Sequence, residues 1–306
     1  MPMPPEELRQ HLRALVRWGV GLVPVDASLR RSENGPGFRR EEIMLWSRPP
    51  LAATLLLPEG PGPHPAVLYC HAHGGEYALG RREVLEGARW LDGPVGPDLA
   101  RAGFAVLAID SPGFGDRQAE GTESATAKAL FWSGKSLFGA MLSDLREALG
   151  YLADRDDIDA DRLYTFGVSM GAAQAWWLAG LDLRVAGCAH ASMLADIRGL
   201  LDAAVHDRHG LYYVVPGLLG VADQGDVAAL VAPRPQFVAL GAQDTLTPPG
   251  ARDPALDCMA RAYGAVPDML ETMVVPEAGH GLTQEMREAA VGFLTRHARI
   301  KERIAT

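Results

Sequence analysis

The segment YTFGVSMGAAQAWWLAG (residues 164–180) decides the fold prediction, because it joins a strand-like run to a helix-like run through one polar residue. Ser169 stands at that junction, with Gly167 and Gly171 two positions away on either side. A strand that turns sharply into a helix brings two backbones together, and glycines remove the side chains that would collide. The spacing G-x-S-x-G between a strand and a helix is typical of a nucleophile elbow, which exposes a serine at the carboxyl edge of a sheet. The alternative is a serine that only caps an ordinary βα turn.

Short apolar runs alternate with amphipathic runs on both sides of this segment. Short, continuous apolar strands are typical of strands that are covered on both faces. Strands that alternate with helices predict an α/β fold with a mostly parallel central sheet flanked by helices. The runs near 41–57 predict an antiparallel pair that extends one edge of the sheet. Strands are expected at 41–46, 51–57, 66–70, 104–110, 162–168, 185–191, 235–241 and 271–276, and helices at 5–18, 136–154, 170–180, 253–264 and 283–299.

Two segments, 112–135 and 192–232, break the alternation and show no clear period. Long irregular insertions in a compact domain are more often lids or binding loops than linkers, so we expect lid-like insertions here. Their aromatic residues predict a partly apolar substrate pocket, although some of them could only pack the insertions themselves. The expected lining residues are Phe114, Phe131, Trp132, Tyr212 and Tyr213.

The composition of the 306 residues is that of an ordinary globular protein, with 48% apolar and 22% charged residues. We expect one domain over residues 1–306. The net charge of −9, with no basic stripe, makes nucleic acid an unsuitable partner. No apolar run is long enough to span a membrane, and residues 1–19 carry charges throughout, so we expect no membrane contact and a cytoplasmic location. The helix at 5–18 could be a cap or a contact in a homodimer.

The three cysteines, Cys70, Cys188 and Cys258, lie in or beside apolar segments. An odd number without motif spacing argues against a disulfide framework or a zinc site, so we expect buried thiols.

A serine nucleophile needs a base, and the base needs an acid that orients it. Asp244 follows a predicted strand in FVALGAQDTLTPP, and His280 follows the last predicted strand in MVVPEAGHGLT. Both come after Ser169 in the chain and at the carboxyl ends of parallel strands, where open α/β sheets place their sites. Asp196 is an alternative acid. His206 and His209 are alternative bases within the second insertion.

The loop LYCHAHGGEYALG (residues 68–80) follows an earlier predicted strand and is the expected source of a second oxyanion donor. The expected donors are the backbone N–H groups of Met170 and of His73 or Gly74. A metal site at His71-x-His73 is an alternative, but no carboxylate or cysteine cluster supports it at a recognisable spacing. His71 is expected to tie the loop to the core.

With these residues in view, the chain resembles the α/β-hydrolase superfamily over nearly its full length. It is most similar to the group that contains dienelactone hydrolase-like and acetyl xylan esterase-like proteins. HGLYYVVPGLL (209–219) also resembles a segment near the active site of the latter. The motifs that follow the family's order are CHAHGG (70–75), AIDSPGFGDR (108–117), DADRLYTFGVSMGA (159–172), LVAPRPQFVALGAQDTLTP (230–248) and PEAGHG (276–281).

This resemblance implies a hydrolase of carboxylic esters that needs no metal or organic cofactor. Dienelactone hydrolases themselves use a cysteine nucleophile, whereas position 169 is a serine, which favours an esterase. The implied partner is a small-molecule ester with a small acyl or aryl group. A thioesterase, an acyltransferase or a peptidase could use the same three residues, and a non-catalytic binding protein could use the same fold.

Overall fold

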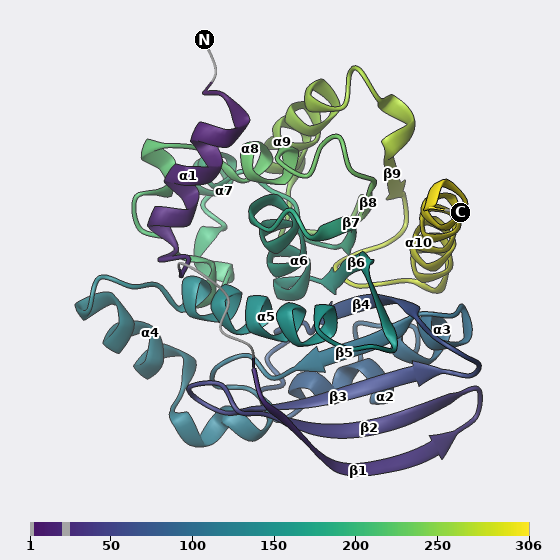
Figure 1. Cartoon of the computed structure of the whole chain (residues 1–306). Helices are drawn as coiled ribbons and strands as arrows, with labels where there is room; N and C mark the ends of the chain where they lie inside the picture. Colours follow the sequence, from purple (N-terminus) through teal and green to yellow (C-terminus); the bar gives the residue numbers. More distant parts are fainter. Residues whose placement is uncertain (1–2, 20–24, 306) are drawn as a thin grey trace.

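The computed structural model describes residues 3–19 and 25–305, in which nine strands form one sheet (Figure 1). The remaining residues of the expected domain 1–306, namely 1–2, 20–24 and 306, lie outside the described part. The strand order is β1-β2-β3-β5-β4-β6-β7-β8-β9. The strands are β1 (Ala27–Gly35), β2 (Phe38–Leu45), β3 (Leu51–Pro58), β4 (His64–Cys70), β5 (Ala105–Ile109), β6 (Ile158–Val168), β7 (Val185–Ala191), β8 (Gln236–Gly241) and β9 (Leu270–Val275).

The sheet from β5 to β9 is parallel throughout, which confirms the prediction of a mostly parallel sheet in an α/β fold. β1, β2 and β3 pair in antiparallel fashion, and β3 also runs antiparallel to β5. The expected antiparallel pair is therefore three strands. β1 escaped the prediction because its sequence, ASLRRSENG, is almost entirely exposed and carries no apolar alternation.

Helices cover both faces of this sheet (Figure 1). The helix expected at 5–18 ends at Leu15. The helices are α1 (Pro5–Leu15), α2 (Glu83–Glu86), α3 (Gly96–Arg101), α4 (Glu123–Trp132), α5 (Leu137–Ala153), α6 (Met170–Leu181), α7 (Ile197–Asp202), α8 (Gln224–Ala229), α9 (Pro249–Ala262) and α10 (Gln284–Ala305). Among the described residues, none of these helices combines the length and apolar character needed to cross a membrane.

The two faces of the sheet carry separate hydrophobic clusters. Buried side chains of α1, α5, α6, α8 and α9 pack on one face, and those of α2, α3 and α10 pack on the other. β4 shows why its sequence is continuously apolar: Ala66, Leu68 and Cys70 belong to the first cluster, and Val67 and Tyr69 to the second. Alternate residues of a strand point to opposite faces, so both sets must be apolar when both faces are covered.

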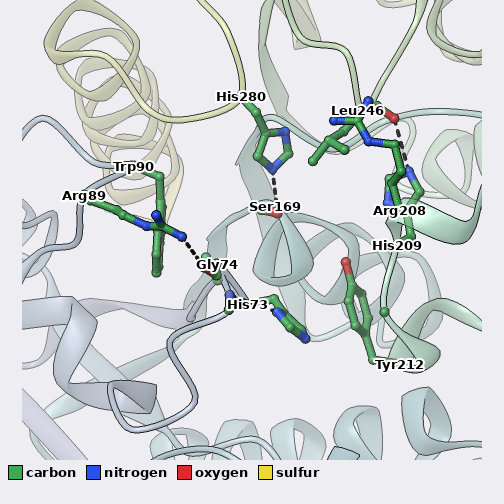
Figure 2. A pocket seen from close by; sticks show the side chains of 13 residues that line it. His73, Gly74, Arg89, Trp90, Ser169, Arg208, His209, Tyr212, Leu246 and His280 are labelled. Atoms are coloured by element: carbon green, nitrogen blue, oxygen red, sulfur yellow. Dashed lines mark hydrogen bonds between the residues drawn. The ribbon is translucent and has the colours of Figure 1, made fainter. Parts of the chain in front are cut away.

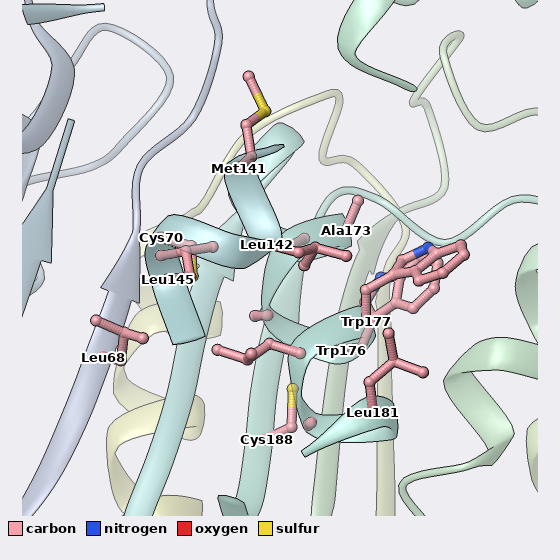
Figure 3. Close-up of a cluster of buried hydrophobic side chains, with 14 of the residues drawn as sticks. Leu68, Cys70, Met141, Leu142, Leu145, Ala173, Trp176, Trp177, Leu181 and Cys188 are labelled. Carbon is pink, nitrogen blue, oxygen red and sulfur yellow. The ribbon is translucent and has the colours of Figure 1, made fainter. Parts of the chain in front are cut away.

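Helix α6, which follows Ser169, is buried along its whole length. Trp176 and Trp177 lie among the side chains of the first cluster (Figure 3). Their indole N–H groups donate to the carbonyl of Met193 at 3.3 Å and to Oε1 of Gln224 at 2.9 Å. The helix behind the elbow is thereby bonded to both ends of the second insertion.

Cys70 and Cys188 are buried thiols, as the sequence predicts, while Cys258 is partly exposed. Burial raises the pKa of Cys188 to about 12, so this thiol stays protonated in the core.

Both insertions contain short helices. The first, 112–135, holds a 3₁₀ turn (Gly115–Glu120) and α4, and the second, 192–232, holds α7, α8 and three 3₁₀ turns between them. Turns this short produce no period that a sequence window could detect.

Candidate active site

Ser169 occupies the sharp turn between β6 and α6. Its φ of 56° and ψ of −119° form a conformation that L-residues rarely adopt and that costs roughly 1–3 kcal/mol. A Cβ on Gly167 would overlap the carbonyl of Gly171, and a Cβ on Gly171 would overlap the carbonyl of Cys70. Both glycines of the motif are therefore required by the close approach of β4, β6 and α6. The Ser169 N–H donates to the carbonyl of Ala191 at 2.9 Å.

The loop after β9 places His280 against this serine. Nε2 of His280 lies 2.8 Å from Oγ of Ser169, and Nδ1 lies 2.7 Å from Oδ2 of Asp244 (Figure 2 shows the first contact). The Nδ1–H group donates to the carboxylate, which leaves Nε2 free to accept from the serine hydroxyl. The structure thus brings together the three residues that the sequence analysis selected.

Asp244 lies in the turn after β8, and its side chain has no exposed surface. Its carboxylate also accepts from the N–H of Leu246 at 2.8 Å and from the hydroxyl of Thr247 at 2.9 Å. Burial alone would raise the pKa of Asp244, but the hydrogen bonds to His280, Leu246 and Thr247 outweigh burial and lower it. The group is an ionised acceptor that fixes the orientation of the imidazole.

The alternative acid and bases occupy other places. Asp196 precedes α7 and accepts from the N–H of Gly225 at 2.7 Å, and burial raises its pKa to about 6. His206 is exposed. His209 lies in the cavity wall, where one ring nitrogen is 3.1 Å from the carbonyl of Leu246.

Two further loops hold His280 in place. The hydroxyl of Ser192 donates to the carbonyl of Gly281 at 2.5 Å and accepts from its N–H at 3.1 Å. The N–H of Leu282 donates to the carbonyl of Trp90 at 2.8 Å. The base is therefore fastened to the end of β7 on one side and to the loop before α3 on the other.

Of the predicted oxyanion donors, His73 and Gly74 line the same cavity as Ser169, and Met170 follows Ser169 directly in the chain. The N–H of Met170 lies in the first turn of α6, where no intrahelical acceptor exists. Within the described residues, the N–H groups of His73 and Gly74 donate to no backbone or side-chain acceptor. Gly74 has a φ of +52°, and a Cβ there would overlap the ring of Trp90. Both amides are therefore free to bind a substrate oxygen, and Gly74 offers its N–H without an obstructing side chain.

The buried carboxylate of Glu83 braces this loop from the side of the sheet. It accepts from the hydroxyl of Tyr69 at 2.7 Å, the N–H of Ala72 at 2.9 Å and the indole N–H of Trp90 at 3.0 Å. Burial raises the pKa of Glu83 to about 7, although these hydrogen bonds oppose that shift.

Glu123, the first residue of α4, braces the loop from the side of the insertions. Its Oε2 accepts from Nε2–H of His73 and from the hydroxyl of Tyr77, both at 2.8 Å, and its Oε1 accepts from the N–H of Tyr212 at 3.0 Å. Burial would raise the pKa of Glu123, but the bonds from His73, Tyr77 and Tyr212 lower it. Sequence reasoning missed Glu123 and Glu83, since nothing local marks a helical glutamate as buried.

His71 ties the loop to the core, in line with the sequence prediction. Its Nδ1–H donates to the carbonyl of Ala72 at 2.9 Å, and its Nε2 accepts from the N–H of Ser111 at 3.0 Å. Burial lowers the pKa of His71, which favours this neutral form. Both ring nitrogens are thus engaged with backbone, and the described residues contain no cluster of three potential metal ligands.

A cavity of about 480 Å³ opens above Ser169 (Figure 2). Of the expected aromatic lining, Tyr212 borders this cavity, and Tyr213 borders a neighbouring, mostly apolar pocket. The cavity is lined by Ala72, His73, Gly74, Gly75, Arg89, Trp90, Ser169, Arg208, His209, Gly210, Tyr212, Leu246 and His280.

Three expected lining residues need correction. Phe114 is completely buried beneath the lining, with its ring centroid 5.2 Å from that of His73. Trp132 is 93% exposed at the end of α4 and is not among the residues that line the cavity. Phe131 instead borders a separate pocket near α1. A helix in an insertion fixes the direction of its side chains through tertiary packing, which the sequence did not reveal.

Residues 65–212 match the family model described as alpha/beta hydrolase fold. Over 235 residues the chain is 39% identical to "Putative hydrolase YtaP" of Bacillus subtilis (strain 168), covering 76% of this chain and 78% of that protein.

Solved structures share the fold at low identity. The glucuronoyl esterase from Solibacter usitatus is 17% identical, with a TM-score of 0.70 over 94% of this chain and 92% of the other. Acetyl xylan esterase 1 from Thermoanaerobacterium sp. JW/SL YS485 is 16% identical, with a TM-score of 0.68 over 97% and 99%. At these identities the likeness is one of fold.

Proposed function

The chain belongs to the α/β-hydrolase family, and from that premise we propose that it is a serine esterase that cleaves small carboxylic esters. The observation that carries the proposal is the pair of hydrogen bonds on His280, 2.8 Å to Ser169 and 2.7 Å to the buried carboxylate of Asp244. A hydroxyl, an imidazole and an ionised acid in that order can generate a nucleophile at neutral pH. Similarity in fold to proteins named as esterases supports the choice of ester substrates.

The proposed reaction has two steps. Oγ of Ser169 attacks the ester carbonyl while Nε2 of His280 takes the hydroxyl proton. The N–H groups of Met170 and of His73 or Gly74 receive the negative oxygen of the tetrahedral intermediate. His280 then gives its proton to the departing alcohol, which leaves an acyl-serine. Water attacks this ester with His280 again as the base, and the acid departs as Ser169 regains its proton.

Hydrolysis of 4-nitrophenyl esters from acetyl to octanoyl, by the wild type and by Ser169→Ala, tests the proposal. Activity that is strongest for the short chains and absent from the folded variant is the expected result. A fluorophosphonate probe that labels the wild type at Ser169, detected by peptide mass, provides a second readout that does not depend on the chosen ester.

Other outcomes would redirect the assignment. Labelling without hydrolysis of any ester would indicate a thioester, an amide or an acyl-transfer reaction on the same three residues. Neither labelling nor hydrolysis by folded protein would contradict the proposal and favour a non-catalytic binding role.

A further inference from the structure

The cavity at Ser169 is lined by two cationic side chains, although the chain as a whole is acidic. The chain carries a net charge of −9. Yet the thirteen residues that line the cavity include two arginines, Arg89 and Arg208, and neither an aspartate nor a glutamate. A concave site lined by one sign of charge concentrates ligands of the other sign.

The two arginines, Arg89 and Arg208, lie on opposite sides of Ser169 (Figure 2). Arg89 donates through one terminal nitrogen to the carbonyl of Gly74 at 2.9 Å, beside the predicted oxyanion donors. Arg208 donates through its two terminal nitrogens to the carbonyl and the hydroxyl of Thr245, at 3.0 and 3.1 Å. These bonds position each guanidinium, and each still has N–H groups for a further acceptor because a guanidinium has five.

Nearby carboxylates leave this positive charge largely uncompensated. Asp244 is bonded to His280 and Glu123 to His73, and among the described residues neither carboxylate forms an ion pair with Arg89 or Arg208. Glu76 does lie 3.3 Å from Nε of Arg89, but the two side chains are 45% and 73% exposed. Ion pairs as exposed as this one contribute little and are readily exchanged for another anion.

We propose that the preferred substrate is an ester that also carries a carboxylate, which Arg89 or Arg208 binds while Ser169 attacks the ester carbonyl. This inference rests on the proposed esterase function and adds the substrate class. A carboxylate suits the two arginines because its two oxygens match the paired N–H groups of a guanidinium. Which arginine engages it depends on whether the charge lies on the acyl or on the alcohol side of the ester.

Two pairs of matched substrates test the proposal. Mono-4-nitrophenyl glutarate is compared with 4-nitrophenyl pentanoate, which places the charge on the acyl side. 4-Acetoxybenzoate is compared with 4-acetoxybenzamide, which places it on the alcohol side. In at least one pair, kcat/KM for the charged ester should be about tenfold higher than kcat/KM for the neutral ester at low salt. That ratio should fall as ionic strength rises.

The same ratio is then measured in Arg89→Gln, Arg208→Gln, the double variant and Arg208→Lys. It should fall about tenfold in the variant of the arginine that binds the carboxylate, and to near unity in the double variant. Arg208→Lys should retain part of any preference for the charged ester that is due to Arg208, because lysine keeps the positive charge but lacks the paired N–H groups of a guanidinium. Arg296→Gln is a control on α10, where Arg296 pairs with Glu271 at the surface, and its ratio should equal that of the wild type.

The failures of the two proposals are distinguishable. Neutral esters cleaved in a Ser169-dependent way, with charged esters no faster in either pair, would overturn the inference and leave the esterase function standing. A charged-ester preference that persists in the double variant would also overturn it, since other residues would then be responsible. Absence of all ester hydrolysis and of fluorophosphonate labelling would overturn the esterase function itself.

Discussion

The two sides of the loop that follows β4 are braced by carboxylates of opposite behaviour. On the sheet side, the buried carboxylate of Glu83 accepts three hydrogen bonds, but burial has the larger effect and raises its pKa to about 7. On the insertion side, hydrogen bonds from His73, Tyr77 and Tyr212 outweigh burial and lower the pKa of Glu123. Each carboxylate accepts three hydrogen bonds, so the two differ in whether burial or hydrogen bonding dominates, and this gives the two sides of the loop opposite pH dependence.

Asp244→Asn is expected to have the largest effect on activity, because it alters the residue that orients the catalytic base. An amide cannot hold His280 in the required tautomer, so kcat for a 4-nitrophenyl ester should fall by about 10⁴. The melting temperature should change much less than the activity. Asp196→Asn is the matched control and should keep kcat within a few-fold of the wild type. A large loss in the control with a small loss in Asp244→Asn would reverse the assignment of the acid.

Gly171→Ala tests the packing at the elbow. The added Cβ would overlap the carbonyl of Cys70, so the backbone of β4 or of α6 would have to shift. The free energy of unfolding should fall by roughly 3 kcal/mol or more, measured by urea denaturation. Gly250→Ala in α9 is the control, because a Cβ there meets nothing within 4 Å and alanine favours a helix. Equal stability of the two variants would show that the elbow is not tightly packed.

The contributions of Glu83 and Glu123 to stability should depend on pH in opposite directions. The pKa of Glu83 is about 7 in the folded protein and has its ordinary value of 4.5 in the unfolded chain, so the folded protein holds this proton more tightly. The folded state therefore binds more protons between pH 4.5 and about 7, and the contribution of Glu83 to stability falls as pH rises through that window, by up to about 3 kcal/mol. Glu123 has the opposite sign, since its contribution is lost only as pH falls below its ordinary value.

Urea denaturation of the wild type and Glu83→Gln from pH 4 to 8 measures this contribution. The stability difference between the two proteins should change across the window. A difference that stays constant with pH would mean that Glu83 does not titrate there.

Glu123→Gln should have a smaller effect, confined to the pocket wall. The amide cannot accept from both His73 and Tyr77 on one oxygen and also serve Tyr212, so one buried donor is left unpaired. We expect kcat for neutral esters to fall about tenfold, with a smaller change in KM. A double-mutant cycle with Tyr77→Phe should give a coupling energy of at least about 0.5 kcal/mol. Additive effects would show that the three donors are not coupled through Glu123.

Trp132→Ala should have the smallest effect, and it tests whether Trp132 lies outside the substrate cavity. The side chain is 93% exposed, so its removal should change the free energy of unfolding by less than about 0.5 kcal/mol. Ester kcat and KM should stay within twofold of the wild type. A several-fold rise in KM would return this residue to the substrate pocket.

Local signals account for what the sequence could predict. The elbow needs glycines at two positions within one turn, and the buried strands need apolar residues on both faces, so both are visible in short windows. β1 was missed because it forms a strand through its pairing with β2, and its own composition gives no strand signal. Glu83 and Glu123 were missed because their bonding partners come from other segments, and for Glu123 one is 89 residues away. The aromatic lining was only partly predicted, since α4 points Trp132 outward.

The hydrogen bond between Ser169 and His280 joins residues 111 positions apart, and the segment that supplies His280 follows β9, a strand at the edge of the sheet. β9 is only partly buried, so it should open on warming before the buried strands at the centre of the sheet. Turnover should consequently vanish before the core melts, and on refolding it should return after the core has formed. Ester hydrolysis therefore reports whether β9 is paired with the rest of the sheet.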